Sequence, residues 1–257
     1  MLFFGGNTFY SLPWHLKRDQ AYFRGIPFCS GIWKQTVPGC AVACPRTFYA
    51  WRSDLDARTN RTPSYLDVGI VEPPHMPWVN DTNEKQGYIN CNPDALPVFE
   101  RTAMSRHAKY KYLLHLEGIA YSSRLSQLML TNSLVLFQRQ PFLEWFYRSL
   151  RPGVHYVPFW NATIFANNGS LLDVYDIIDD LRRRDEKDPR DLQRMITAAN
   201  NFAMKFTTAT GRARYLREAL TAYRALFIDM DPYLEQFVAG LKAQGKWKEA
   251  KDSSVDH

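Results

Sequence analysis

The chain has 257 residues, enough to bury the core of one large domain, and its hydrophobic content of 46% with 14% aromatic residues excludes a disordered protein. Its 32 basic and 26 acidic side chains give a net charge of +6, which suits an anionic ligand without identifying one. The basic residues are spread along the chain with no run of five or more, which argues against a nucleic-acid partner.

Targeting signals are sparse in the sequence. No apolar run reaches the roughly 18–20 residues that a membrane-spanning helix needs, so we expect no transmembrane segment in this chain. The first ten residues, MLFFGGNTFY, also lack the basic region and the sustained apolar segment of a signal peptide. Four Asn-x-Ser/Thr sequons, at Asn60, Asn80, Asn161 and Asn168, nevertheless favour the secretory pathway.

The four cysteines (Cys29, Cys40, Cys44 and Cys91) could form two disulfides, and three of them crowd one loop. They include no Cys-x-x-Cys pair and have no suitably spaced histidines. The pattern therefore favours disulfides or free thiols over a zinc site.

In chain order, residues 1–20 are aromatic and loop-like and read as a lead-in rather than the start of a domain. Residues 20–24 (QAYFR) predict a short strand that ends at Gly25. Residues 26–45 predict a loop longer than most ordered connections, which favours a functional role. A helix is predicted over residues 46–56.

Another strand and helix follow. Residues 65–72 (YLDVGIVE) predict a strand, which two prolines close, and residues 73–95 form a loop rich in Pro and Asn. Residues 96–108 have a helical pattern, with Pro97 in the first turn, where proline is tolerated.

The central stretch alternates strands with helices. Its segments in order are a strand (110–116), a helix start (122–124), a strand (133–138), a helix (141–150) and a strand (155–159). This alternation implies parallel βαβ units, in which ligands bind beyond the carboxyl ends of the strands. Residues 118–124 therefore lie at the binding edge, where the N–H groups of a helix start and the Arg124 cation favour an anion such as phosphate.

The C-terminal part is predicted to be helical. Apolar residues recur at helical spacing in residues 171–184, 188–206 and 212–227. The end of the chain, from about Gln244, is charged and is expected to fray.

Five blocks of the sequence occur together in one order: YKYLLHLEG, then Ser-x-Arg, then TNSLVL, then FLEWFY, then LRPGVHYVP. In this order they resemble glycosyltransferase family 90, the capsule-associated and Rumi-type protein O-glucosyltransferase family. Upstream, Tyr22-Phe23-Arg24-Gly25 resembles the aromatic-Arg-Gly strand end of that family, and Arg46 matches its second arginine. The resemblance covers roughly residues 18–230.

The resemblance implies a GT-B fold, in which two Rossmann-like lobes hold a nucleotide-sugar donor in the cleft between them. The chain then corresponds to the C-terminal lobe: an α/β, Rossmann-like parallel sheet flanked by helices, with a helical C-terminal region. Residues 1–20 would lead in from a missing or truncated N-terminal lobe, residues 21–230 would form the donor-binding domain, and residues 231–257 a charged tail.

Family membership also implies an inverting transfer of a glucose- or xylose-like sugar from a UDP-sugar, with no metal and no further cofactor. The acceptor would be a protein or glycan hydroxyl in the lumen of the endoplasmic reticulum or Golgi. The matching donor-binding residues are Arg24, Gly25, Arg46, Ile119, Ala120, Tyr121, Ser122, Ser123 and Arg124. Ile26 replaces a donor-contacting serine and Ala108 replaces a cysteine, which leaves the sugar and the acceptor open.

Arg124 is the strongest candidate, because a fixed guanidinium stabilises the charge that develops on a departing diphosphate without a metal. Its alternative role is a surface or helix-capping arginine. Ser122 and Ser123 could donate hydrogen bonds to phosphate or cap the helix. Arg24 could reach a phosphate or the sugar, or it could form a structural ion pair.

Weaker candidates surround these residues. Glu144 could accept hydrogen bonds from ribose hydroxyls or be an exposed helix acid, and Tyr121 could stack on uracil or fill the core. His155 is interpreted as structural. Lys109 and Lys111 share one strand face, which more often meets solvent than a cleft.

Two Asp-x-Asp triplets, residues 54–56 and 229–231, spell a metal-binding motif of another glycosyltransferase fold, but neither follows a strand and we expect no metal. Gly240-x4-Gly245-Lys246 mimics a phosphate loop, but Trp247 replaces its hydroxyl residue.

The catalytic base remains unknown, because the lobe that carries an aspartate base in the family has no counterpart here. We expect the base outside this chain. The leading hypothesis is a UDP-sugar glycosyltransferase of which the chain supplies the donor lobe. The alternative is a catalytically inactive nucleotide-sugar-binding or interaction module, and turnover assays would separate the two.

Overall fold

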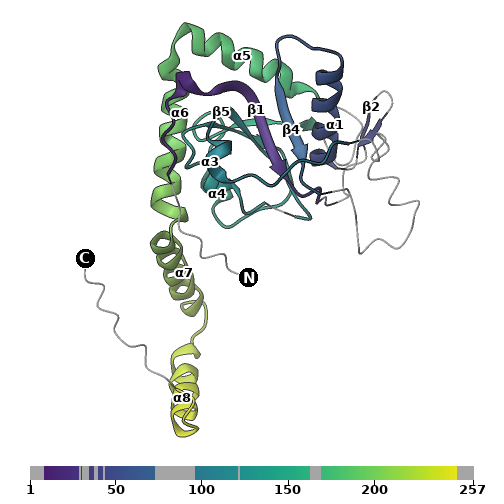
Figure 1. Ribbon diagram of the computed structural model, residues 1–257. Helices are drawn as coiled ribbons and strands as arrows, with labels where there is room; N and C mark the ends of the chain where they lie inside the picture. The colour runs from purple at the N-terminus through teal and green to yellow at the C-terminus, as the bar shows by residue number, and fades with distance from the viewer. Residues whose placement is uncertain are drawn as a thin grey trace. The chain divides into compact units, whose positions relative to one another are not determined.

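The computed structural model describes residues 9–28, 30, 35–37, 40–42, 44–72, 96–120, 122–162 and 169–247 (Figure 1). The chain divides into two compact units, Met1–Thr208 and Ala209–His257. The first unit contains the sheet and all of the predicted site residues. The second contains helices.

A five-stranded parallel sheet forms the centre of the first unit, in the strand order β4-β1-β5-β6-β7. Its strands are β1 (Arg18–Gly25), β4 (Leu66–Ile70), β5 (Tyr110–His115), β6 (Leu134–Gln138) and β7 (Val157–Phe159). The sequence predicts all five. Two short antiparallel pairs, β2 (Gln35–Val37) with β3 (Cys40–Val42) and β8 (Asn161–Ala162) with β9 (Gly169–Ser170), lie outside it.

Both faces of the sheet are buried, which is why its strands read as continuous apolar runs. Alternate residues of β1 show the division: Ala21 and Phe23 belong to one core cluster and Tyr22 to the other. The first face is covered by α1 (Pro45–Arg58), α5 (Asp173–Lys187) and the first half of α6 (Pro189–Phe202) (Figure 1).

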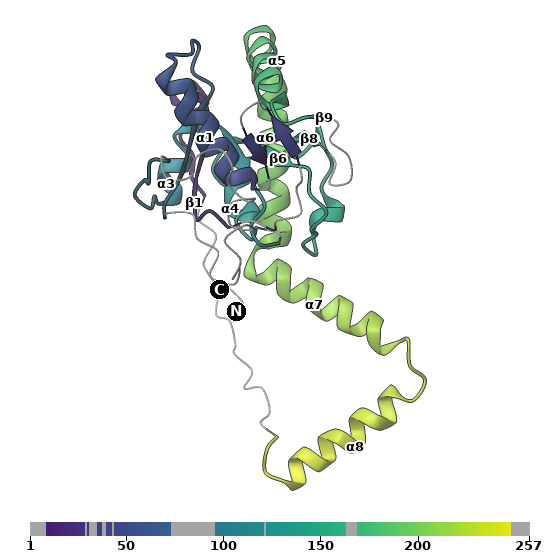
Figure 2. The same ribbon diagram turned by 90° about the vertical axis from the view of Figure 1, so that its right-hand side faces the viewer.

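The second face is covered by shorter elements (Figure 2). These are α3 (Met104–His107), α4 (Leu125–Leu128), the 3₁₀ turn η3 (Tyr147–Ser149) and the π-helical turn η4 (Ala203–Thr207). A parallel sheet between two helical layers confirms the predicted α/β, Rossmann-like architecture.

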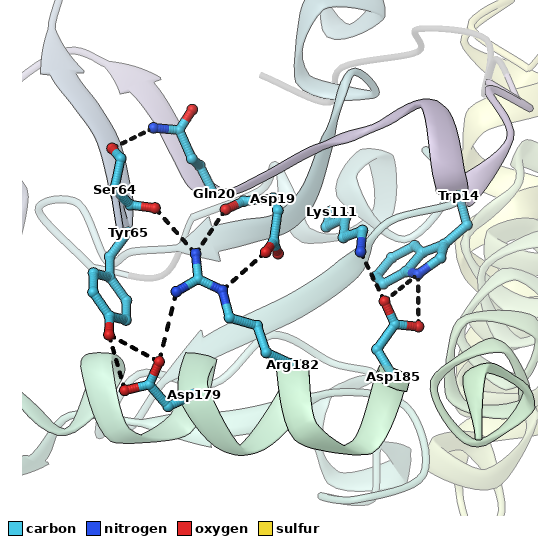
Figure 3. A network of polar contacts seen from close by, with 9 residues as sticks. All are labelled: Trp14, Asp19, Gln20, Ser64, Tyr65, Lys111, Asp179, Arg182 and Asp185. Carbon is cyan, nitrogen blue, oxygen red and sulfur yellow. Dashed lines mark hydrogen bonds and ion pairs between the residues drawn. The ribbon is translucent and has the colours of Figure 1, made fainter. Parts of the chain in front are cut away.

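Helix α5 is fixed to the amino-terminal ends of the central strands (Figure 3). Arg182 donates to the carboxylate of Asp19 at 2.9 Å and to the carbonyl of Ser64 at 3.0 Å. One turn further along α5, Asp185 accepts from Lys111 Nζ at 2.7 Å and from the indole N–H of Trp14 at 2.9 Å. These contacts occupy the amino-terminal edge of the sheet, and ligands of open α/β sheets generally bind at the opposite, carboxyl edge.

Two predicted helices are much shorter than expected. The helix over residues 96–108 is wrong except for α3, because the segment first runs extended beside β4, where Phe99 N donates to the Ile70 carbonyl at 2.8 Å. The helix predicted over residues 141–150 is wrong except for η3. The aromatic residues of this segment pack into the second core cluster, and they do not form the single apolar stripe that one face of a helix would present.

The second unit contains α7 (Ala209–Arg224), as predicted, and α8 (Met230–Ala243). Helix α8 occupies the first part of the segment expected as a charged tail, residues 231–257. Tyr233 and Phe237 are spaced four residues apart on α8 and their rings stack at 6.1 Å, a contact that favours helix. Within the described ranges, no helix is both long and apolar enough to cross a bilayer.

Candidate functional site

The carboxyl ends of β1 and β5 mark the point where the strand order reverses. From β1 the chain passes through α1 to β4 on one side, and it later enters β5 on the other side of β1. Open α/β sheets bind their ligands in the crevice at such a switch point. Residues 26–28 follow β1 here, and residues 116–118 follow β5.

Arg46 joins these two loops. It is the second residue of α1. Cys44, at the N-cap position of this helix, is disulfide-bonded, which is one of the two alternatives that the cysteine pattern left open. Arg46 Nη1 donates to the Ile26 carbonyl at 2.7 Å and its Nη2 to the Leu116 carbonyl at 3.3 Å. The side chain is 7% exposed, and its buried Nε has no hydrogen-bond partner in the described part of the chain. The Nε–H donor is therefore unused among the described residues.

Arg124 approaches the same place from the loop after β5. Its Nη1 donates to the Arg24 carbonyl at 2.6 Å, and its guanidinium carbon lies 5.4 Å from the centre of the Phe23 ring. The guanidinium carbon of Arg46 lies at the same distance, 5.4 Å, from that ring. Two cations thus share one aromatic ring at the switch point.

Burial lowers the pKa of both arginines. The pKa of Arg46 falls to about 9 through loss of solvent and the nearby positive charge of Arg124, while the negative Glu117 opposes the shift. Burial is also the main cause of the lowered pKa of Arg124. Both side chains remain charged near neutral pH, so an added anion would offset their mutual repulsion.

Two glycines make room for these guanidiniums. A Cβ on Gly118 would lie 3.2 Å from Arg46 Nη2, and a Cβ on Gly25 would lie 3.4 Å from Arg124 Nη1 and 2.7 Å from the Phe23 ring. Glycine at the two strand ends therefore allows each arginine to lie against the backbone.

Arg24 turns away from the other two arginines. Its guanidinium forms an ion pair with Asp67 on β4, donates to the Asp67 carbonyl at 2.8 Å and lies 4.1 Å from the Phe99 ring. Arg24 therefore forms a structural ion pair, which was the alternative to a contact with phosphate or sugar. Arg24 contributes its backbone carbonyl to the site by holding Arg124.

The loop before Arg124 differs from the expected helix start. Helix α4 has a single turn, its N-cap position is Arg124 itself, and no side chain caps it. Helix capping, one of the two roles considered for Ser122 and Ser123, is therefore not observed, and few aligned N–H groups are available. Gly118 N donates to the Ala120 carbonyl at 2.9 Å, and Ile119 is 51% exposed. Tyr121 lies outside the described residues.

Two hydrogen bonds of the buried Tyr147 hydroxyl fix this loop. The Tyr147 hydroxyl donates to the Ser122 carbonyl at 3.2 Å and lies 3.1 Å from His115 Nε2. Because the Tyr147 hydroxyl donates its proton to the Ser122 carbonyl, its oxygen can only accept from His115. His115 must therefore carry its proton on Nε2. Loss of solvent, and then the charges of Arg46 and Arg124, lower the pKa of His115 to about 3 and keep it neutral.

Glu117 is a site residue that the sequence alone does not reveal, because it reads as part of a strand-breaking Glu-Gly pair. It is fully buried, accepts from Ser30 Oγ at 2.5 Å, and its backbone N–H donates to Gln138 Oε1 at 2.9 Å. Its carboxylate partly balances the charge of the two arginines. A glutamate directly after a buried strand was the available signal.

The other acidic residues and the histidine considered from the sequence have the following positions. Glu144 is partly buried just before η3. His155 is structural as predicted, since its Nδ1 accepts from Arg151 N at 2.9 Å. Asp54 and Asp56 form ion pairs within α1, to Arg58 and Arg52. Over the described residues, no cluster of three His, Cys, Asp or Glu side chains could hold a metal ion.

Comparisons with known proteins identify the family of the chain. Residues 7–256 match the model of the family described as glycosyl transferase family 90. O-glucosyltransferase rumi of Drosophila pseudoobscura pseudoobscura is 46% identical over 171 residues, which cover 63% of this chain and 34% of that protein. Protein O-glucosyltransferase 1 of Homo sapiens is 29% identical over 169 residues, which cover 66% of this chain and 35% of that protein.

A sucrose-phosphate synthase from Thermosynechococcus elongatus superposes with a TM-score of 0.43 at 9% identity, over 84% of this chain and 47% of that one. The chain spans about a third of the length of the curated relatives it matches, at 34–35%. Because the family match extends over nearly the whole sequence, the chain belongs to glycosyl transferase family 90.

Proposed function

We propose that this chain is the donor-binding lobe of a GT-B glycosyltransferase that transfers a glucose- or xylose-like sugar from a UDP-sugar. The observation that carries this proposal is the pair of guanidiniums of Arg46, which is buried, and Arg124, which is partly buried, placed over the Phe23 ring at the switch point. A diphosphate is the ligand whose charge suits these two cations at this edge.

In the proposed reaction a base removes the proton of an acceptor hydroxyl, and the oxygen attacks the anomeric carbon of the sugar. The bond between that carbon and the phosphate oxygen breaks, its electron pair goes to UDP, and the configuration inverts. Arg46 and Arg124 stabilise the charge that develops on the leaving diphosphate, so no metal is required. No described residue is assigned as the base.

The names of the relatives support the sugar class, since both are O-glucosyltransferases. By extension we propose a protein or glycan hydroxyl as the acceptor and the lumen of the secretory pathway as the compartment. The exposed sequon residue Asn60 is consistent with that compartment.

The second candidate function is a nucleotide-sugar-binding module without turnover. It is favoured by one observation: donor-side arginines are present among the described residues while no base is assigned there. Incubating the chain with UDP-glucose and an acceptor and measuring UDP release distinguishes the two, because sustained acceptor-dependent release excludes the inactive module.

Isothermal titration of UDP tests the shared donor site. Arg124→Ala should abolish detectable binding, while Arg183→Ala, which changes an exposed arginine on α5, should leave it intact. Binding should persist in EDTA if the site needs no metal. Unchanged UDP affinity of Arg124→Ala would contradict the site assignment.

A further inference from the structure

Helices α7 and α8 belong to the second compact unit and are joined by a turn of residues 225–229 (Figure 2). They have 16 and 14 residues, and none of the residues described in them is buried. Isolated helices of this length are marginal in water, because most helical stability in proteins comes from packing of an apolar face. The two helices therefore need a surface that covers them.

Both helices carry an apolar face with the same spacing. The apolar positions are Leu216, Ala219, Leu220, Tyr223 and Phe227 in α7 and the turn after it, and Met230, Tyr233, Leu234, Phe237 and Leu241 in α8. In each set the residues follow the order i, i+3, i+4, i+7 and i+11, which is typical of a helix that packs in a bundle. These faces are wider than the seam of a two-stranded coiled coil, so they fit an assembly of several helices.

The exposed apolar surface is large enough for a stable interface. Eight large apolar side chains between residues 216 and 237 are each at least 42% exposed. At ~100 Å² for each, about half of what a large side chain can bury, they present roughly 800 Å². A standard protein interface buries about this area on each partner.

The charges beside these faces differ in sign between the two helices. Helix α7 has four arginines and one glutamate, a net charge of +3, whereas α8 has an aspartate, a glutamate and a lysine, a net charge of −1. Arg217 and Arg224 line a hollow of about 440 Å³ together with Leu234 of α8. Asp231 and Glu235 line a second hollow of about 380 Å³, which shares Arg224 and Leu234 with the first. A surface that is basic along one helix and acidic along the other is complementary to a copy of itself after a twofold rotation.

We propose that the face formed by α7 and α8 binds a second copy of this chain, with α7 of one protomer against α8 of its partner. The two pairs of helices then form a four-helix bundle, and the twofold axis places Arg217 opposite the partner's Glu235 at two equivalent contacts. Arg224 and Asp231 already form an ion pair within one chain, whereas Arg217 and Glu235 are exposed and carry opposite charges. An anionic membrane surface fits this face less well, because it would repel Asp231 and Glu235.

Charge reversal in the full chain tests this arrangement by sedimentation velocity. We expect the wild-type chain to dimerise at ~100 µM, since interfaces of standard size reach micromolar affinity or better. Arg217→Glu and Glu235→Arg should each weaken dimerisation by about 10- to 100-fold, because each places like charges at both equivalent contacts. Mixing the two variants should restore a dimer, because both contacts of the mixed pair again join opposite charges. Misfolded variants would not regain association on mixing.

Arg183→Glu is the matched control, because it reverses an exposed charge on α5 and should leave dimerisation unchanged. Leu220→Asp puts a charge on the apolar face and should abolish the dimer. A wild-type chain that stays monomeric at this concentration overturns the proposal, and so does a mixture of the two charge variants that associates no better than either alone. Co-sedimentation of a monomeric wild-type chain with phosphatidylserine vesicles would overturn it in favour of a lipid surface.

Discussion

Arg46→Met is the most informative single change in the donor site. Methionine fills much of the space of the buried stem but removes the charge and every donor. The substitution breaks the hydrogen bonds to the Ile26 carbonyl at 2.7 Å and the Leu116 carbonyl at 3.3 Å. It also removes a guanidinium whose pKa is lowered to about 9 by burial and by Arg124.

These effects act on stability in opposite directions. Each lost charge-assisted hydrogen bond costs about 1.5–3 kcal/mol, whereas removing a buried cation next to another returns a comparable amount. We therefore expect the free energy of unfolding to fall by only about 1–3 kcal/mol. UDP affinity has no such compensation, so losing one charge-assisted contact to phosphate should weaken it about 10- to 150-fold.

The assay is isothermal titration of UDP, paired with urea unfolding of each variant. Arg46→Lys keeps the charge but cannot reach both loop carbonyls at once, so its UDP affinity should fall between wild type and Arg46→Met. Arg52→Met is the matched control, because Arg52 lies on the same helix and pairs with Asp56 at 3.2 Å. It should lower stability without changing UDP affinity.

One result would refute the reasoning. If Arg46→Met is folded and binds UDP within about threefold of wild type, Arg46 only ties the loops after β1 and β5 together. The phosphate contacts would then have to come from elsewhere at this edge.

Three further predictions follow from the described contacts. His115 has a pKa lowered from 6.5 to about 3, so its contribution to stability is complete above pH 6.5 and is lost as the pH falls towards 3. The contribution of His115 should therefore be about 2 kcal/mol smaller at pH 5 than at pH 7, so the stability difference between these pH values in urea unfolding should be smaller by about that amount in His115→Gln than in wild type. Gly118→Ala places a Cβ 3.2 Å from Arg46 Nη2, so it should weaken UDP binding more than it lowers the melting temperature, and equal UDP affinity would contradict the close packing. Arg182→Ala removes the contacts of α5 to two strand ends and should lower the unfolding free energy by about 1–3 kcal/mol with no effect on UDP affinity, a separation that titration and urea unfolding would check.

The family resemblance read from the sequence identified two residues that the structure brings together, Arg46 and Arg124. The sequence did not distinguish the arginines that lie at the switch point from the one that forms a structural ion pair. Arg24 carries the same side chain at a strand end, yet it is 6% exposed and turned to Asp67, a residue 43 positions away.

The sequence by itself determined the parallel strands and the long amphipathic helices of this protein, because a strand or a helix face repeats within a few neighbouring residues. Only the tertiary structure decided that residues 96–108 and 141–150 are mostly not helical, since contacts with β4 and with the aromatic core outweigh local propensity. The tertiary structure also determined which residues come together at the site. The position of Arg46 depends on carbonyls 20 and 70 residues away, which no local pattern encodes.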